Sequence, residues 1–323
     1  MRTFIRFLTL SLVLLTLVSC AAPQQASETG YVDAVTMETV ELEDEAIALA
    51  ASPAAVSTML TAEASGISVN SNSEATIDYS NTGDGYVMVK YTASTTKRLK
   101  AQVKGPATTY TYNLTPGKWE VFPLSDGNGS YKITVYRNAY SNKYASVLSV
   151  TTSVSLTDEF APFLRPNQYV DYSAAPKAVE KAAELTAGLS DPLDMVEAVY
   201  DYVVGTLTYD NYKASTVKSG YLPVLDTTLA EKKGICFDYA ALMTGMLRSQ
   251  GIPCKMIFGY AGSVYHAWIN VWTEDTGWVD GVIYFDGMTW QHLDPTFASS
   301  ANQNSSVEAY IGNGSNYTEK YMY

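Results

Sequence analysis

The feature that most constrains the fold is the run from Lys233 to Thr296. It holds two of the three cysteines, Cys236 and Cys254, both histidines of the 323-residue chain and Asp294. The stretch from Cys236 to Gly251 has apolar residues at i, i+3, i+4, i+7 and i+8, namely Tyr239, Leu242, Met243, Met246 and Leu247. This spacing predicts a helix, with Gly251 at the position after its C-cap. Cys236 therefore lies at or next to the helix N-terminus.

Two extended segments follow the predicted helix. The sequence SVYHAWINVWT alternates and is rich in β-branched and aromatic residues, which places His266 on a strand. The sequence MTWQHLDPTF predicts a second strand that ends at Asp294, because Pro295 cannot donate to a sheet ladder. The order is thus cysteine at a helix start, histidine on one strand and aspartate at the end of a later one.

This order fits a Cys/His/Asp triad with Cys236 as nucleophile, His266 as general base and acid, and Asp294 as the group that orients the imidazole. Unpaired N–H groups at a helix N-terminus favour the thiolate form. A lone cysteine on an apolar helix is more often a buried small hydrophobe, and Cys254 fits that description. His292 is the rival base, but it stands two residues before Asp294 on the same predicted strand face, a poor geometry for bridging to Cys236.

The same residues carry a family resemblance. The blocks GICFDYAALMTGMLRSQGIPCKMIFGY, YHAWINVW and WQHLDPTF follow one another in order, and together they resemble the transglutaminase-like superfamily of papain-type folds. The resemblance covers roughly the last half of the chain. It implies an α+β domain over 157–323, and it makes Tyr209 a weaker candidate for the cleft or the oxyanion site, with packing as its alternative role.

The activity that this resemblance implies is acyl transfer through a thioester, with no cofactor and no metal. Hydrolysis of peptide or amide bonds, as by a peptidase or amidase, is the expected outcome, on a protein, peptide or cell-wall peptide substrate. The alternatives are transfer to an amine by a transglutaminase and a non-catalytic surface module that only binds.

The N-terminus predicts export. Residues 1–20 carry two arginines, then an apolar run from Phe7 to Val18 that is too short to span a bilayer, then Val-Ser-Cys. This ending resembles a bacterial lipoprotein signal, cleaved before Cys20, which would take the lipid. The alternative is an ordinary secretory signal cut near Ala22. The protein is then expected outside the cytoplasm, held to the membrane only by its lipid anchor.

Charge limits the partners. Removing residues 1–20 deletes two arginines and no acid, so the formal net charge changes from −12 to −14. An acidic chain is a poor ligand for nucleic acid or an anionic membrane surface, so neither is expected as a partner, and we expect a monomer. The mature chain has two other cysteines, Cys236 and Cys254, and a disulfide between them would abolish the nucleophile. We therefore expect free thiols.

The first half of the chain has a different character. Residues 21–66 have the composition of a tether, either disordered or with a short helix over 44–60. Residues 67–156 contain seven short alternating runs separated by turn signals, typical of an antiparallel, immunoglobulin-like β-sandwich. Its tyrosines, among them Tyr110, Tyr112, Tyr131 and Tyr136, either stack on sugars or fill the sheet. Presentation of substrate, glycan binding and spacing are the roles open to this module.

The region before Cys236 predicts a linker over 158–176 and helices over 176–188 and 191–205, the second capped by Asp191. Residues 213–226 are rich in Ser, Lys and Gly and predict a loop that is long enough to form one wall of a cleft. Lys232 and Lys233 favour a thiolate at Cys236, whereas Asp238 in the first helical turn opposes it.

Overall fold

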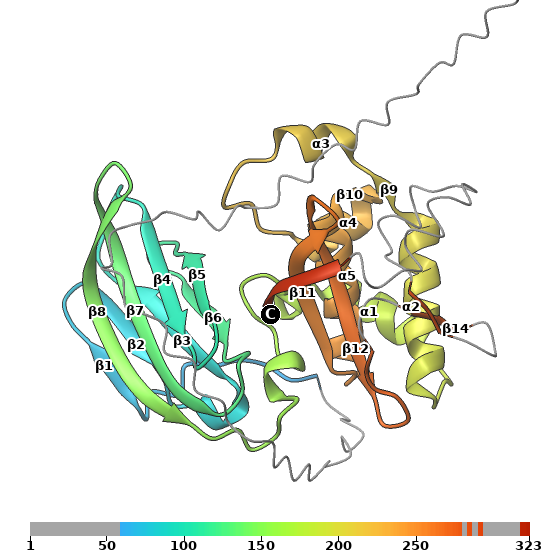
Figure 1. Ribbon diagram of the computed structural model, residues 1–323, viewed down its shortest axis with the longest axis horizontal. Helices are drawn as coiled ribbons and strands as arrows, with labels where there is room; N and C mark the ends of the chain where they lie inside the picture. The colour runs from blue at the N-terminus through green and yellow to red at the C-terminus, as the bar shows by residue number, and fades with distance from the viewer. Residues whose placement is uncertain (1–58, 280–282, 286–289, 293–316) are drawn as a thin grey trace, which may run out of the picture.

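The computed structural model describes residues 59–279, 283–285, 290–292 and 317–323. They form an N-terminal β-sandwich and a C-terminal α+β domain, which lie side by side (Figure 1). This confirms the predicted fold class. Asp294, Cys20 and the predicted signal peptide lie outside the described residues, and so does the alternative helix, apart from its last two residues.

The sandwich has eight strands, one more than the seven alternating runs. All of its strand pairs are antiparallel, and the two sheets have the orders β1-β2-β3-β6 and β5-β4-β7-β8. The strands are β1 (Val69–Ser71), β2 (Ala75–Asp78), β3 (Tyr86–Tyr91), β4 (Leu99–Lys104), β5 (Thr109–Asn113), β6 (Trp119–Pro123), β7 (Gly129–Tyr140) and β8 (Lys143–Val154). The unpredicted strand is β1, whose three residues are too few to show an alternation.

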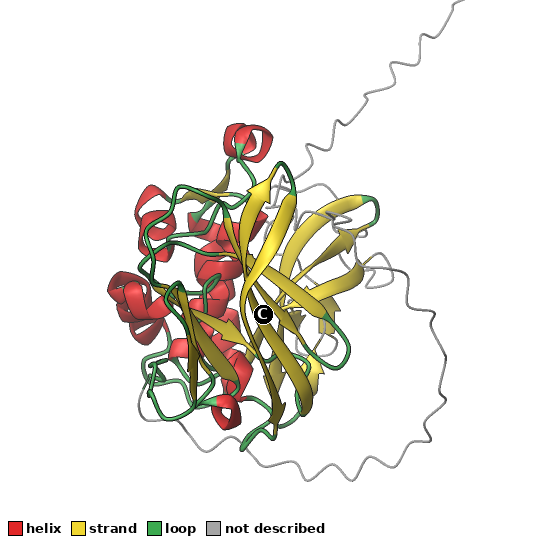
Figure 2. Cartoon of the chain, turned by 90° about the vertical axis from the view of Figure 1, so that its left-hand side faces the viewer, coloured by secondary structure: helices red, strands yellow, loops and turns green. Residues whose placement is uncertain are grey.

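The C-terminal domain is built around one buried helix and a four-stranded sheet. The helices are α1 (Pro176–Leu185), α2 (Pro192–Thr206), α3 (Asn211–Thr216), α4 (Leu225–Glu231) and α5 (Cys236–Ser249). The strands are β9 (Thr208–Tyr209), β10 (Lys233–Gly234), β11 (Cys254–Ala261), β12 (Val264–Thr273), β13 (Gly277–Val279), β14 (Ile283–Phe285), β15 (Trp290–His292) and β16 (Tyr317–Met322). The main sheet has the order β13-β12-β11-β16 and is antiparallel throughout. The helices gather to one side of the strands (Figure 2).

Helix α5 is the core of this domain. Every residue from Cys236 to Arg248 is buried, so the helix packs on all of its faces, against α1, α2 and α4 and against β11 and β12. The sequence showed one apolar stripe, but small residues such as Ala240, Ala241 and Gly245 allow neighbours to approach the other faces closely. A Cβ on Gly245 would lie 2.6 Å from Leu225 Cδ1 of α4.

Helices α1 and α2 begin where the sequence predicts, by two different mechanisms. Asp191 caps α2 locally, because its carboxylate accepts a hydrogen bond of 2.8 Å from Leu193 N. Helix α1 has no cap of its own. The Asp226 carboxylate of α4 accepts instead from Lys177 N (3.2 Å) and Ala178 N (2.8 Å), which joins two helices that are distant in sequence.

The segment predicted as a linker is an integral part of the interface between the domains. Phe160, Val170 and Tyr172 are buried, and two short 3-10 helices, Ala161–Phe163 and Tyr172–Ala174, lie within the segment. Gln168 N donates to Val121 O of β6 at 3.0 Å, while Arg248 of α5 donates to Arg165 O at 2.8 Å. The linker is thus bonded to both domains.

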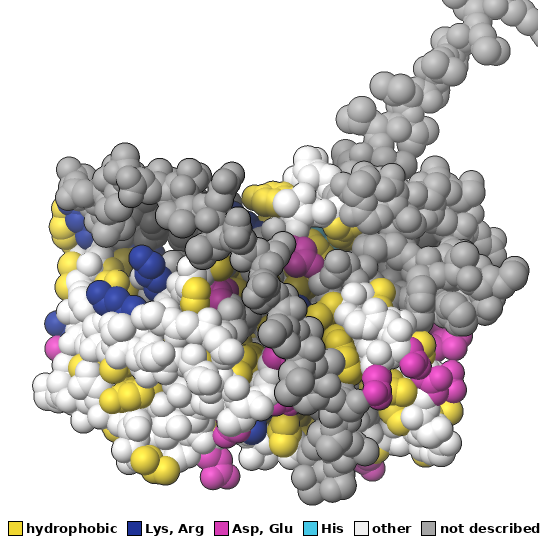
Figure 3. All heavy atoms as spheres, turned by 60° about the horizontal axis from the view of Figure 1, so that its bottom comes forward, with side chains coloured by type: hydrophobic (Ala, Val, Ile, Leu, Met, Phe, Trp, Pro, Cys, Tyr) yellow, Lys and Arg dark blue, Asp and Glu magenta, His cyan; other side chains and the backbone are white. Residues whose placement is uncertain are grey.

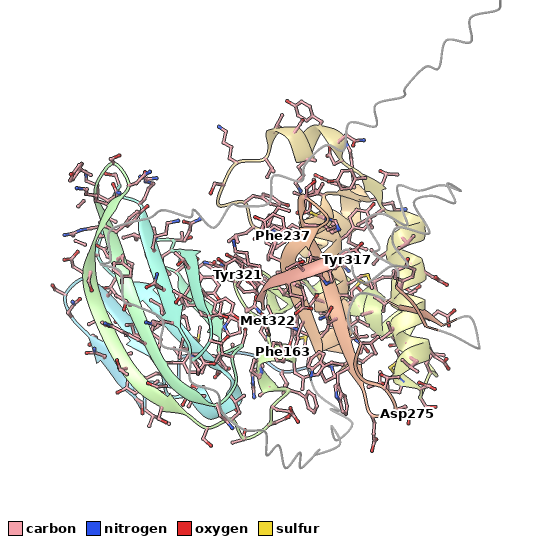
Figure 4. All side chains as sticks on the ribbon, viewed as in Figure 1. Phe163, Phe237, Asp275, Tyr317, Tyr321 and Met322 are labelled. Atoms are coloured by element: carbon pink, nitrogen blue, oxygen red, sulfur yellow. The ribbon has the colours of Figure 1, made fainter. Side chains whose placement is uncertain are left out.

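Tyrosines fill the interface itself. Tyr323 is fully buried, and its ring lies 5.5 Å from that of Tyr110 and 5.8 Å from that of Tyr112 in the sandwich. Tyr321 lies between the two domains, with its ring 5.9 Å from that of Tyr110 (Figure 4). Because Tyr110, Tyr112 and Tyr131 are at most 1% exposed, they cannot form a sugar-stacking surface. The hypothesis of sheet packing is correct for these three, and Tyr136 is half-buried.

The surface carries charges of both signs. In Figure 3, lysine and arginine side chains are visible on the sandwich, and acidic side chains gather on the C-terminal domain at the end away from it. Among the described helices, none is long and apolar enough to cross a bilayer.

Candidate active site

Cys236 is the first residue of α5, as the sequence predicts. Ile235 precedes it as the N-cap in an extended conformation, and its backbone N–H donates to Asp238 Oδ2 at 2.8 Å. The carboxylate at the third helical position thereby satisfies one of the donors that a helix start leaves open. The thiol lies in a helical turn whose backbone is fixed, with the partial positive charge of the helix N-terminus next to it.

His266 lies on β12, opposite Gly259 of β11. The pairing leaves no room for a side chain at position 259, since a Cβ there would lie 2.1 Å from Thr318 O of β16 and 2.5 Å from the Trp268 ring. Trp268 is two residues after His266, and the two rings are stacked at 6.4 Å. Gly259 therefore lets β16 and the Trp268 ring approach closely beside the histidine.

The structure brings the first turn of α5 next to the start of β12. The Phe237 ring lies 4.9 Å from Phe258, which in turn stacks on Tyr265 at 5.9 Å. Burial raises the pKa of Tyr265 well above its usual value, and the nearby Cys236 thiol contributes to this shift. Cys236 and the Tyr265–His266 segment, 29 residues away in sequence, thus lie in one region of the protein.

Both side chains of this region are enclosed: Cys236 is 0% exposed and His266 is 1% exposed. Asp294, the predicted third member, lies outside the described residues. His292, the rival base, ends β15, where it pairs with Ile283.

Tyr209 lies on a strand that is paired with the residues just before Cys236. Strand β9 pairs in parallel with β10, with Tyr209 opposite Gly234, two residues before Cys236. Asp210 N continues the ladder by donating to Gly234 O at 2.8 Å. A Cβ on Gly234 would lie 2.5 Å from Asp238 Cβ, so the glycine is needed for this packing. Tyr209 therefore borders the turn that carries the thiol, and its role in the cleft stays a prediction.

The second cysteine is remote from the first. Cys254 Sγ lies 3.6 Å from Thr244 Oγ1, and Thr244 is eight residues along α5 from Cys236, about 12 Å at 1.5 Å per residue. That separation exceeds the reach of a disulfide. Both thiols are free, and burial raises the pKa of Cys254 to about 11. Cys254 therefore stays protonated at neutral pH, as a core residue should.

The charge balance around Cys236 differs from the sequence prediction. Lys233 pairs with Asp210 at 3.2 Å, and Lys232 ends α4 in a left-handed conformation (φ 51°). The cation that meets Asp238 is Lys213 of α3, whose Nζ lies 2.7 Å from Asp238 Oδ2. Sequence reasoning missed this pair because 25 residues separate the partners and no helical spacing relates them.

A cavity of about 480 Å³ lies at the interface, away from the thiol. It is lined by the sandwich turn 125–128, residues 156–160, Phe163, Lys255 and Trp278. Lys255 is four residues along β11 from Gly259, about 13 Å at a strand rise of 3.3 Å. The cavity is thus separate from the region of Cys236 and His266. No group of His, Cys, Asp and Glu in the described part of the chain could hold a metal ion.

One family model matches part of the C-terminal domain. Residues 179–281 match the family model of the transglutaminase-like superfamily. This segment carries Cys236 and His266, and it is similar to transglutaminase-like domains.

Two bacterial relatives are similar over part of the chain. Uncharacterized protein YebA of Bacillus subtilis (strain 168) is 29% identical over 117 residues, which cover 30% of this chain and 16% of that protein. Uncharacterized protein ML0607 of Mycobacterium leprae (strain TN) is 30% identical over 181 residues, which cover 52% of this chain and 55% of the relative. The chain therefore spans about half or less of the length of these two relatives.

Among solved structures, a candidate cysteine protease from Cytophaga hutchinsonii is 18% identical. The match covers 74% of this chain and 91% of that one, with a TM-score of 0.35.

Proposed function

We propose that this protein is an exported enzyme with Cys236 as its nucleophile, and that it hydrolyses peptide or amide bonds through a thioester. The observation that carries the proposal is the position of Cys236 at the first residue of α5, with that turn against the segment of β12 that holds His266. A thiol at a helix N-terminus beside an imidazole has the two components of an activated sulfur nucleophile.

In the first step, the Cys236 thiolate attacks the amide carbonyl, and a C–S bond forms. The backbone N–H of Cys236 donates to the developing oxyanion. His266, protonated by the thiol, gives its proton to the leaving nitrogen as the C–N bond breaks, and the acyl-enzyme remains. In the second step, His266 removes a proton from water, the hydroxide attacks the thioester, and the thiol is released. Asp294 is the proposed orienting group for His266.

The decisive experiment is trapping of the full chain with a peptide-like electrophile that reacts with thiols, followed by identification of the labelled residue. We expect the label on Cys236, with loss of labelling in His266→Ala and no effect of Cys254→Ala. Labelling that is independent of His266, or absent from Cys236, would contradict the proposal.

Transfer to an amine is the second outcome to test, because both reactions share the acyl-enzyme. A glutamine peptide and a labelled primary amine distinguish the two reactions. We expect release of ammonia or peptide cleavage without label incorporation. Cys236-dependent incorporation would identify a transglutaminase instead. A wild-type protein that binds peptide without turning it over, and a Cys236→Ala variant that binds it equally well, would leave only a binding module.

Export is a separate part of the proposal, based on the first twenty residues. Mass spectrometry of the mature N-terminus in a bacterial host should find a lipid on Cys20. An unmodified N-terminus that begins beyond Cys20 would contradict the lipid anchor without affecting the proposed chemistry.

A further inference from the structure

The first turn of α5 contains a buried carboxylate that the proposed chemistry does not use. Asp238 is 0% exposed and lies two residues after Cys236. A negative charge at this position opposes a thiolate in the same turn. Burial of an unpaired carboxylate would also be costly, so a compensating cation is expected next to it.

The compensation comes from the segment between β9 and α4. Lys213 Nζ donates to Asp238 Oδ2 at 2.7 Å and to the Tyr221 hydroxyl at 2.6 Å, and its ammonium lies 4.3 Å from the centre of the Tyr221 ring. The Tyr221 hydroxyl donates to the other carboxylate oxygen, Asp238 Oδ1. Burial and the charge of Asp238 raise the pKa of Tyr221 well above its usual value, so the phenol keeps the proton that it donates.

The same carboxylate holds the backbone next to the nucleophile. Asp238 Oδ2 accepts from Ile235 N at 2.8 Å as well as from Lys213. One oxygen thus connects the segment that carries Lys213 to the N-cap of α5. In Figure 1, α3 lies over the β9–β10 end of the domain, where α5 begins. Any shift of Lys213 would therefore be transmitted to the peptide unit that precedes Cys236.

The charge environment of the thiol includes groups from each neighbouring element. In the described residues these are Asp238 on α5, Lys213 on α3, Tyr221 after it, the Lys233–Asp210 pair at β10 and β9, and Tyr265 and His266 on β12. Lys213 makes its ion pair with the carboxylate closest in sequence to the thiol, and its side chain is 27% exposed. Its charge therefore acts where solvent screening is weak.

We infer that Lys213 and Tyr221 are positioning residues for the Cys236 nucleophile. They neutralise and hold Asp238, so that the helix start can stabilise a thiolate, and they fix the segment 213–224 as a rigid wall beside it. This inference rests on the proposed function of Cys236. By this inference, residues outside the Cys/His/Asp set keep the thiol reactive at neutral pH.

The test is the pH dependence of iodoacetamide labelling at Cys236 in the full chain, read site by site by mass spectrometry. Lys213→Met removes the cation and leaves Asp238 uncompensated, so the midpoint of the labelling curve should move to higher pH. A midpoint one pH unit higher lowers the thiolate fraction about tenfold at pH values below it. Because the more basic thiolate is a better nucleophile, the labelling rate at neutral pH should fall about threefold.

Matched variants separate charge from folding. Lys213→Arg should keep the wild-type midpoint, and Tyr221→Phe should shift it less than Lys213→Met. Lys218→Met removes an exposed lysine from the same segment and should change nothing. If Lys213→Met does not fold, Lys213→Gln keeps a donor for Asp238 without the charge and should show the same upward shift.

Two results would overturn the inference. In the first, the wild-type midpoint lies below that of a free thiol, about 8.5, and neither Lys213→Met nor Lys213→Gln changes it although the circular dichroism of both variants stays native. The proposed function would survive this result. The other is an ordinary free-thiol profile in the wild type, which would overturn the proposed function and this inference together.

Discussion

At the end of α5, a single buried arginine connects three parts of the chain. Arg248 donates to Cys254 O through Nε (2.9 Å) and Nη2 (2.7 Å), to Arg165 O (2.8 Å) and to Tyr323 O (2.6 Å). Burial lowers the pKa of Arg248 to about 10, which still leaves it charged at neutral pH. The guanidinium thus holds the linker, the start of β11 and the segment after β16 with one planar group.

Removing this group should be costly. Arg248→Met removes four hydrogen bonds to Cys254 O, Arg165 O and Tyr323 O, although Tyr323 O keeps its bond from Met256 N (3.0 Å), so we expect the free energy of unfolding to fall by about 3 kcal/mol. Arg248→Lys keeps a charge but not the fork of donors, and should lose less. Urea denaturation measures both, with Lys177→Met, an exposed helical lysine, as a control that should show no change. An Arg248→Met protein as stable as wild type would contradict the proposed role of the arginine.

Gly259, opposite His266, is a second residue whose substitution should destabilise the protein. In Gly259→Ala the added methyl would meet Thr318 O and the Trp268 ring, so β16 or the tryptophan must shift. We expect a loss of about 1–3 kcal/mol in the free energy of unfolding, together with lower reactivity of Cys236 as His266 moves.

The matched control for Gly259 is Gly205→Ala in α2, where nothing lies within 4 Å of the new methyl. A helical glycine without steric constraint gains about 0.5–1 kcal/mol on this change. Thermal or urea unfolding of both variants should therefore give changes of opposite sign. A Gly259→Ala protein as stable and as reactive as wild type would show that the close approach is not needed.

Among the helices and strands, some begin at a residue that local sequence signals set, and others begin where a distant residue caps them. The start of α2 is set by Asp191, Pro192 and the apolar spacing after them, all visible in the sequence. The start of α1 depends on Asp226, 50 residues further along the chain. The α5 helix and β12 were predicted with close to their observed bounds. Most of α3 and the start of α4 lie in the segment 213–226, which was predicted as a loop.

We predict that Asp226→Ala will destabilise the protein by about 1 kcal/mol, as loss of a helix cap does, although Asp226 is not on the helix that it caps. Asp201→Ala, an exposed acid within α2, is the control and should have little effect. Chemical denaturation compares the two. Equal effects would mean that the two bonds from α1 to Asp226 contribute nothing measurable.

At the scale of the whole molecule, the two domains share one aromatic interface. Tyr112 of β5 lies 4.3 Å from Phe122 and 5.5 Å from Tyr169 of the linker, ring to ring. Tyr169 in turn contacts Phe237, the residue after Cys236, at 5.5 Å. The sandwich therefore supports the turn that carries the thiol, and we expect the two domains to unfold in one cooperative transition.

This interface predicts the response to alkaline pH. Burial raises the pKa of Tyr112 well above 10, and Tyr110, Tyr172 and Tyr323 shift in the same direction. Unfolded tyrosines lose their protons near pH 10, while the folded ones keep them, so folding stability is fully present below pH 10 and is lost as the pH rises above it. Urea titrations between pH 8 and 11, with tyrosinate absorbance recorded in parallel, should show the loss of stability and the deprotonation of these tyrosines together.

Tyr112→Phe tests the same interface by removing one buried hydroxyl. The Tyr112 hydroxyl is buried with no hydrogen-bond partner among the described residues. Its removal should therefore raise the free energy of unfolding by about 1 kcal/mol and weaken the loss of stability above pH 10. Tyr110→Phe is the contrasting variant: its hydroxyl donates to Asp126 at 3.1 Å, so its removal should not stabilise. A destabilised Tyr112→Phe protein would contradict this account.

The sequence by itself determined the main elements of both domains and the places of Cys236 and His266 on them. A helix beginning at Cys236, a strand through His266 and a sandwich of alternating strands all depend on periodicity and turn residues, which are local properties. For the same reason the sequence placed the Asp191 cap correctly.

Only the tertiary structure decided which distant groups meet. The pairing of Lys213 with Asp238, the capping of α1 by Asp226, the four hydrogen bonds of Arg248 and the burial of Tyr110, Tyr112 and Tyr323 between the domains depend on packing. Such contacts join residues with no periodic relation in the chain. Charge neutralisation and exclusion of water select these partners, and both act only once the domains have come together.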